Sequence, residues 1–221
     1  PYQITSDEKV IFPVSVQANG STVYTIKAGI PQECPVKACG RYYPERVDDV
    51  AWENDLTAFR AYGPALQETG ERAFGYDIWT KYNTTEPVVE ARYEGELNPD
   101  MKAKIAELGK TDPKAAQELY RSVSYHVDHG NGLDCYKVGP TLGGGTTALM
   151  AGDTIVYPYC YATQEILDNG PLRFTVKLVY NPLVVKGDST IIETRIITLD
   201  AGSYCDKTVV SYTNLKETMP L

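Results

Sequence analysis

Apolar and polar positions alternate along residues 9–17, which is the period of a β-strand with one buried face. Asn19-Gly20 follows, and a second apolar run covers residues 23–26. Alternation on both sides of Asn-Gly predicts a β-hairpin. The next segment, residues 31–46, is rich in Pro, Cys, Gly and Arg and is predicted to be a loop.

Further strands are predicted along most of the remaining chain. Residues 47–64 read as two short strands around Glu53-Asn54-Asp55, and residues 73–82 read as another. Long runs rich in β-branched residues follow, with Asn169-Gly170 as a turn between two of them. The predicted strands of this second half are 146–150, 153–162, 171–181, 188–199 and 203–213.

Two helices interrupt the β pattern. Asn98 is the predicted N-cap of the first, Pro99 takes its first position, and Gly109 ends it. Asp112-Pro113 repeats the same start for the second helix, whose buried face is predicted to carry Leu119, Tyr120 and Val123.

These elements predict a mainly β protein built as a large antiparallel sandwich with two short inserted helices, because the later strands follow one another without helices between them. The length of 221 residues suits one such domain. The chain starts at Pro1 in the middle of an apparent strand, so we expect a fragment of a longer protein that lacks N-terminal strands.

Composition narrows the classes of partner. A net charge of −8 argues against binding to nucleic acid or an anionic membrane surface, and no apolar run is long enough to span a membrane. The 17 tyrosines suit sugar recognition, since each offers an apolar face and a hydroxyl, and they equally suit strands. Of the five cysteines, mostly buried free thiols are expected, with a Cys34–Cys39 bridge possible if the protein is exported.

Both histidines of the chain lie in one glycine-containing segment, residues 125–137. Such a concentration of polar groups is typical of an active-site loop, and a hydrogen-bonded turn is the structural alternative. Either histidine suits a catalytic base near neutral pH. A divalent metal site is the other functional alternative. Its candidate ligands are His126, Asp128, His129 and Asp134.

A second polar cluster covers residues 52–62. Arg60 can bind a carboxylate through two parallel hydrogen bonds, and Trp52 can stack on a sugar ring. The alternative is a cross-strand ion pair between Arg60 and one of the nearby acids. The other members of this cluster are Glu53, Asp55 and Tyr62.

Several longer motifs resemble one known family. They are Trp52-Glu53-Asn54-Asp55 with Ala58 to Leu66, Gly75 to Trp79, Tyr125-His126 with Gly132 to Gly143, Tyr157 to Tyr161, and Ile166 to Phe174. Together they resemble the domain-of-unknown-function family 4861 of polysaccharide-degrading bacteria. The resemblance implies a β-supersandwich similar to galactose mutarotases, export to the periplasm or cell surface, and a place among enzymes that degrade pectin-like or ulvan-like polymers.

The expected function is β-elimination on uronic-acid-containing oligosaccharides by a lyase or dehydratase. Its chemistry assigns neutralisation of the substrate carboxylate to Arg60, the base to His126 or His129, and the acid to Tyr125 or Tyr136. Substrate binding falls to Trp52, Glu53, Asp55, Tyr62, Trp79 and Lys137. An aldose mutarotase or epimerase that uses a histidine and a carboxylate such as Glu53 is one alternative, and a non-catalytic carbohydrate-binding domain is another.

Overall fold

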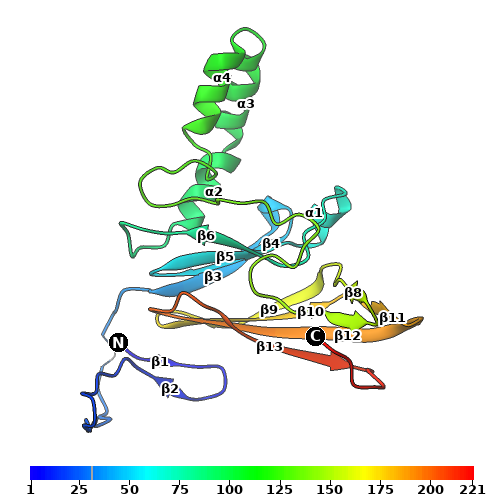
Figure 1. The fold of residues 1–221 in the computed structure, drawn as a ribbon. Helices are drawn as coiled ribbons and strands as arrows, with labels where there is room; N and C mark the ends of the chain where they lie inside the picture. Colours follow the sequence, from blue (N-terminus) through cyan, green and yellow to red (C-terminus); the bar gives the residue numbers. More distant parts are fainter. Residues whose placement is uncertain (31) are drawn as a thin grey trace.

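The described part of the chain is mainly β, with two large antiparallel sheets, two small two-stranded sheets and four α-helices (Figure 1). A computed structural model describes residues 1–30 and 32–221. One sheet has four strands in the order β3-β4-β5-β6, and the other has five, with β12 pairing both β10 and β13. The predicted strands at 146–150, 171–181, 188–199 and 203–213 are confirmed within a few residues. The range 153–162 instead divides between two strands, of which the second continues to Asn169, and the short strand at Leu183–Val185 was not predicted.

The four-stranded sheet is a meander of neighbouring strands. Its members are β3 (Ala38–Tyr43), β4 (Asp49–Asn54), β5 (Thr57–Ala61) and β6 (Tyr76–Thr80). The five-stranded sheet contains β9 (Tyr161–Asn169), β10 (Arg173–Tyr180), β11 (Leu183–Val185), β12 (Asp188–Asp200) and β13 (Lys207–Thr213). Two small ladders complete the β structure: β1 (Gln3–Ile4) with β2 (Val10–Ile11), and β7 (Leu149–Ala151) with β8 (Thr154–Val156).

The two large sheets pack face to face around one hydrophobic core. Trp52 of β4 lies between Phe59 of β5 and Phe174 of β10, with ring centroids 5.8 and 6.3 Å apart. Val176 and Leu199 extend this core along the five-stranded sheet. Burial of such large apolar side chains contributes about 1.5–3 kcal/mol each, so this layer is the main source of stability.

The opposite face of the four-stranded sheet carries the helices. α2 (Val89–Leu97) packs Val89 and Tyr93 against Ala51, Ala58 and Trp79 of the sheet. α3 (Pro99–Gly109) and α4 (Pro113–Arg121) form a hairpin that projects away from both sheets (Figure 1). α1 (Pro64–Glu68) and the 3₁₀ turn η1 (Pro44–Arg46) lie in connections between strands.

Both predicted helix starts are confirmed by their caps. The side chain of Asn98 accepts a hydrogen bond from the Met101 amide at 2.9 Å, and that of Asp112 accepts one from the Ala115 amide at 3.0 Å. The predicted buried face of the second helix is wrong: Tyr120 is exposed, Leu119 and Val123 are only half-buried, and Ala116 is the buried residue of the helix. α1 and α2 were not predicted.

Two predictions for the N-terminal region are wrong. Residues 12–30 carry no strand, and Val10–Ile11 pairs with Gln3–Ile4 instead of with a partner after Asn19-Gly20. Residues 38–43, predicted as loop, form edge strand β3. No helix in the described ranges is long and apolar enough to cross a membrane. All five cysteines are unbridged, including Cys34 and Cys39, and only Cys160 is buried.

Candidate functional site

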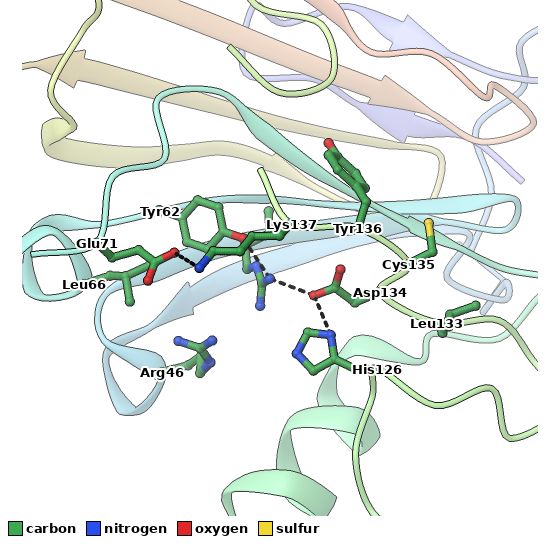
Figure 2. Close-up of a pocket in the computed structure, with 11 residues that line it drawn as sticks. Arg46, Tyr62, Leu66, Glu71, His126, Leu133, Asp134, Cys135, Tyr136 and Lys137 are labelled. Atoms are coloured by element: carbon green, nitrogen blue, oxygen red, sulfur yellow. Dashed lines mark hydrogen bonds and ion pairs between the residues drawn. The ribbon is translucent and has the colours of Figure 1, made fainter. Parts of the chain in front are cut away.

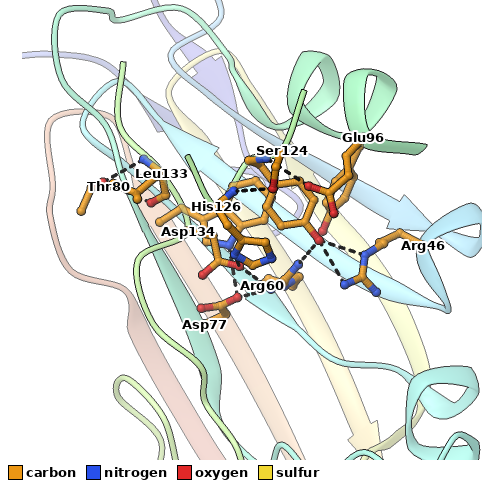
Figure 3. Close-up of polar contacts among 12 residues, drawn as sticks. Arg46, Arg60, Asp77, Thr80, Glu96, Ser124, His126, Leu133 and Asp134 are labelled. Carbon is orange, nitrogen blue, oxygen red and sulfur yellow. Dashed lines mark hydrogen bonds and ion pairs between the residues drawn. The ribbon is translucent and has the colours of Figure 1, made fainter. Parts of the chain in front are cut away.

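A buried arginine organises the outer face of the four-stranded sheet. Arg60 of β5 is 2% exposed and forms an ion pair with Asp77 of β6, its cross-strand partner (Figure 3). Its guanidinium also bonds Asp134 at 2.9 Å and lies 3.8 Å from Asp49 of β4. Burial of one cation is thus balanced by several carboxylates, which is the condition for keeping a charge inside a protein. The cross-strand ion pair of Arg60 is real, but its partners are neither Glu53 nor Asp55.

The histidine segment reaches this arginine because it is fastened along the edge of β6. The Thr80 amide donates to the Leu133 carbonyl at 2.9 Å, and the Asp134 amide donates to the Tyr125 carbonyl at 2.9 Å. Gly132 has φ +97° where the segment meets β6, and a Cβ there would lie 2.0 Å from the Thr80 carbonyl oxygen. Only glycine fits that approach, and it sets the position of Asp134.

The segment and the sheet enclose a pocket of about 440 Å³ (Figure 2). It lies between the histidine segment, the outer face of β5 and the region of α1. Its lining mixes cations, carboxylates, phenols and one imidazole. The lining residues are Arg46, Arg60, Tyr62, Leu66, Glu71, His126, Leu133, Asp134, Cys135, Tyr136 and Lys137.

His126 lies at the wall of this pocket with its side chain 49% exposed. Its Nδ1 lies 3.4 Å from Oδ2 of Asp134, and its ring packs against Tyr125 with centroids 4.6 Å apart. No hydrogen bond within the described part of the chain engages Nε2. A carboxylate facing Nδ1 favours the tautomer with its proton there, which leaves a lone pair on Nε2.

Burial changes the acidity of the groups around Arg60. The pKa of Asp134 is raised to about 6 and that of Asp49 to about 7, in both cases because burial disfavours the charged carboxylate more than the nearby arginines favour it. Burial also raises the pKa of Tyr136 to about 12 and that of Tyr62 further still. Both phenols therefore carry their protons near neutral pH.

Arg46 is a pocket residue that the sequence analysis missed. It follows the β3 strand in η1, and its Nε and Nη2 donate to the Tyr125 hydroxyl at 3.2 and 3.1 Å. Arg60 Nη1 donates to the same hydroxyl at 3.4 Å. Tyr125 is itself buried below the pocket, so it positions the two arginines and does not line the cavity. No local sequence signal distinguishes Arg46 from an arginine in a loop.

Of the four proposed metal ligands, only His126 and Asp134 meet. Asp128 accepts hydrogen bonds from the amides of Gly130 and Gly132 at 2.8 and 3.1 Å, which closes the turn. His129 is exposed, and its Nε2 bonds the Ser124 carbonyl at 3.0 Å. Within residues 1–30 and 32–221, no group of three or more His, Cys, Asp and Glu side chains is arranged to hold a metal ion. His129 also lies outside the pocket, so His126 is the candidate base.

Several expected substrate-binding residues lie elsewhere. Trp52 is in the sandwich core and Trp79 is buried against Tyr125, so neither offers a face to a sugar. Glu53 is buried, bonds Lys81 Nζ at 2.7 Å and accepts from the Val88 and Val89 amides at the start of α2. Asp55 accepts from the Gly202 amide at 2.7 Å, in a turn. Only Tyr62 and Lys137 of the expected binders line the pocket.

The chain matches the family described as Domain of unknown function (DUF4861) over residues 1–221. The chain belongs to this family. It is also 29% identical over 185 residues to "Uncharacterized protein P7" of Formosa agariphila, and this match covers 80% of the chain and 41% of the relative. The match thus spans less than half the length of that relative. No solved structure gives a significant match.

Proposed function

We propose that this DUF4861 domain acts on uronic-acid-containing oligosaccharides by β-elimination. The observation that carries the proposal is the His126–Asp134 pair at the wall of a pocket that also presents two arginines and two protonated phenols. β-Elimination next to a carboxylate needs a base, a cation and an acid in one cavity, and this pocket supplies all three.

His126 is the proposed base. Its Nε2 lone pair accepts the proton from the carbon next to the sugar carboxylate, while Asp134 stabilises the imidazolium that forms. The electron pair of the broken C–H bond forms the C=C bond, and the neighbouring C–O bond breaks. Tyr136 gives its proton to the departing oxygen. Its hydroxyl donates to the Tyr76 carbonyl at 2.9 Å, so the proposal requires the side chain to turn toward the cavity before it gives that proton up. Its raised pKa keeps the proton in place beforehand.

Neutralisation of the substrate carboxylate falls to Arg46, with Lys137 at the rim. The sequence analysis assigned this role to Arg60, but the Arg60 guanidinium is already engaged by Asp77 and Asp134. Arg46 is less buried and has only a distant carboxylate partner, Asp49 at 3.9 Å. A fork-shaped guanidinium beside a cavity suits a planar carboxylate.

The finer fold and the location form part of this proposal. Two antiparallel sheets packed face to face are compatible with a supersandwich of the galactose mutarotase kind, and we propose that arrangement for the whole protein. Export to the periplasm or cell surface is proposed with it, since polymeric uronates lie outside the cell.

A mutarotase or epimerase is the second candidate. The same pair favours it, because a histidine and a carboxylate in one pocket are the acid and base that sugar ring opening requires. Asp134 replaces Glu53 in this role, since Glu53 is bound by Lys81 and the start of α2.

The test is to incubate the full-length protein with uronic acid oligosaccharides, with and without a chelator. The ultraviolet absorbance of an unsaturated uronate and the product masses are followed. A rise in absorbance supports elimination, and the masses separate loss of water from chain cleavage. Anomer exchange of neutral aldoses without that absorbance supports the mutarotase, and binding of a glycan without turnover supports a carbohydrate-binding domain.

A further inference from the structure

Two exposed tyrosines stand beside the pocket on a surface that the proposed reaction does not use. Tyr157 and Tyr159, which precede β9, are 39% and 41% exposed. The ring of Tyr157 stacks on Phe74 with centroids 4.9 Å apart and an interplanar angle of 29°. The guanidinium of Arg72 lies over the ring of Tyr159, 5.4 Å from its centroid. We refer to Arg72, Phe74, Tyr157 and Tyr159 as the aromatic platform.

The aromatic platform continues the wall of the pocket. Glu71 lines the pocket and lies 3.6 Å from Lys137 Nζ at its rim, and Arg72 is the next residue along the chain. Arg72 is fixed by donating to the Gln67 carbonyl at 3.2 Å, at the end of α1. The Phe74 amide donates to the Thr141 carbonyl at 3.2 Å, which ties the platform to the segment that carries Tyr136 and Lys137.

The rings are held in place although they remain exposed. Phe74 supports Tyr157 from one side, and Arg72 supports Tyr159 in the same manner. By contrast, Tyr161 nearby is buried and bonds the Asp48 carbonyl. A fixed aromatic ring with an open face binds the apolar face of a sugar with little loss of conformational entropy.

We infer that the aromatic platform is a second sugar-binding subsite, which takes the unit adjacent to the one in the pocket. The identity of this ligand rests on the proposed function, and the subsite makes the substrate an anionic oligosaccharide and not a single uronic acid. Arg72 at the platform and Lys137 at the rim supply the positive charge that a chain of uronates would meet.

The experiment measures binding as a function of ligand length. Calorimetry of the full-length protein with size-fractionated uronic acid oligosaccharides, from monosaccharide to hexasaccharide, is compared with the same titrations of Tyr157→Ala and Tyr159→Ala. Tyr159→Phe is titrated as well, because it keeps the aromatic ring and removes only the hydroxyl. Tyr204→Ala is the matched control, since Tyr204 is also an exposed tyrosine but belongs to the β12–β13 turn. This turn is attached to the end of β4, where the Asn54 side chain donates to the Ser203 carbonyl at 2.6 Å.

The wild type should bind longer chains about tenfold more tightly than the monosaccharide, a difference of about 1.4 kcal/mol. Each alanine variant should lose most of that gain while its monosaccharide affinity is unchanged, and Tyr159→Phe and Tyr204→Ala should retain it. Affinity that does not depend on length, or a gain that survives both alanine variants, would overturn the subsite. The turnover assay tests the proposed reaction independently of the subsite. Binding that depends on chain length, without any elimination, would support the subsite and contradict the proposed reaction.

Discussion

The imidazole of His126 and the carboxylate of Asp134 face each other at 3.4 Å, with the same carboxylate oxygen bonded to Arg60. One oxygen thus connects a half-exposed imidazole to a buried cation. Arg60 holds the carboxylate in place and the carboxylate faces the imidazole, so the position of the proposed base depends on the sheet beneath it. This dependence separates residues that act in the pocket from residues that position them.

Replacing His126 by alanine should abolish elimination without loss of binding or folding. The side chain is half exposed and makes no hydrogen bond beyond its contact with Asp134, so its removal costs little stability. Loss of a general base lowers the rate about 100- to 10,000-fold. The measurement is the initial rate on uronic acid oligosaccharides, with affinity determined separately.

His129→Ala is the matched control for that variant. This second histidine belongs to the same segment but lies outside the pocket and bonds only the Ser124 carbonyl. Its variant should retain activity close to that of the wild type. Full activity in His126→Ala, or an equal loss in both variants, would remove His126 as the base.

Activity should fall as the pH drops below about 6, the raised pKa of Asp134. Protonation removes the negative charge that faces Nδ1, so the imidazole loses the partner that orients it and stabilises its charged form. The measurement is the pH profile of kcat/KM. Asp134→Asn lacks the negative charge at every pH, so its activity should be at least about tenfold lower than that of the wild type throughout. Because asparagine does not titrate, the fall in activity below about pH 6 should also be weaker in this variant. An acid limb that is identical in the two proteins would contradict the assignment.

Signals that are local in sequence predicted their elements well. The caps at Asn98 and Asp112 specify helix starts through side chains three residues from their targets. The prediction of a hairpin at Asn19-Gly20 was wrong because alternating apolar residues show only that one face of a strand would suit burial. They do not identify the part of the protein that would cover that face. Strand β3 was missed because its free edge is completed by a distant side chain: Asn169 bonds both the amide and the carbonyl of Gly40.

The site was harder to predict because sheet register assembles it. His126 and Asp134 stood out because they share one unusual segment. Asp49 and Asp77 carry no local signal, and they meet Arg60 only because β4, β5 and β6 pair in this register. Trp52 illustrates the converse error, since an aromatic that suits sugar stacking equally suits a core, and its place in the alternation of β4 decides between them.

Arg60→Gln should destabilise the protein by about 3–5 kcal/mol, because it leaves buried carboxylates without their cation. Arg60→Lys should recover part of this loss, since it restores the charge but not the planar guanidinium, whose Nη2 contacts Asp77 and Asp134 while Nη1 faces Asp49. The measurement is the free energy of unfolding in urea. Combining Arg60→Gln with Asp134→Asn should be less damaging than the sum of the two single changes, and strict additivity would show that the pair is not coupled.

Asp49 should make the stability of the protein decline as the pH rises. Folding raises the pKa of this carboxyl from 3.8 to about 7, because burial penalises its charged form. The folded chain therefore holds the proton more tightly than the unfolded chain does. The resulting stabilisation is complete below pH 3.8 and is lost progressively as the pH rises through about 7.

Asp49→Asn isolates this effect from the other titrating groups. Asparagine keeps the shape and remains neutral at every pH, and it can still accept from the Tyr93 hydroxyl, which lies 3.2 Å from the carboxylate. The variant should gain stability relative to the wild type between pH 4 and pH 8, on the order of a few kcal/mol. Urea unfolding of both proteins across this range gives the difference. A constant difference would mean that Asp49 is charged in the folded protein throughout, held so by Arg60 and Arg46.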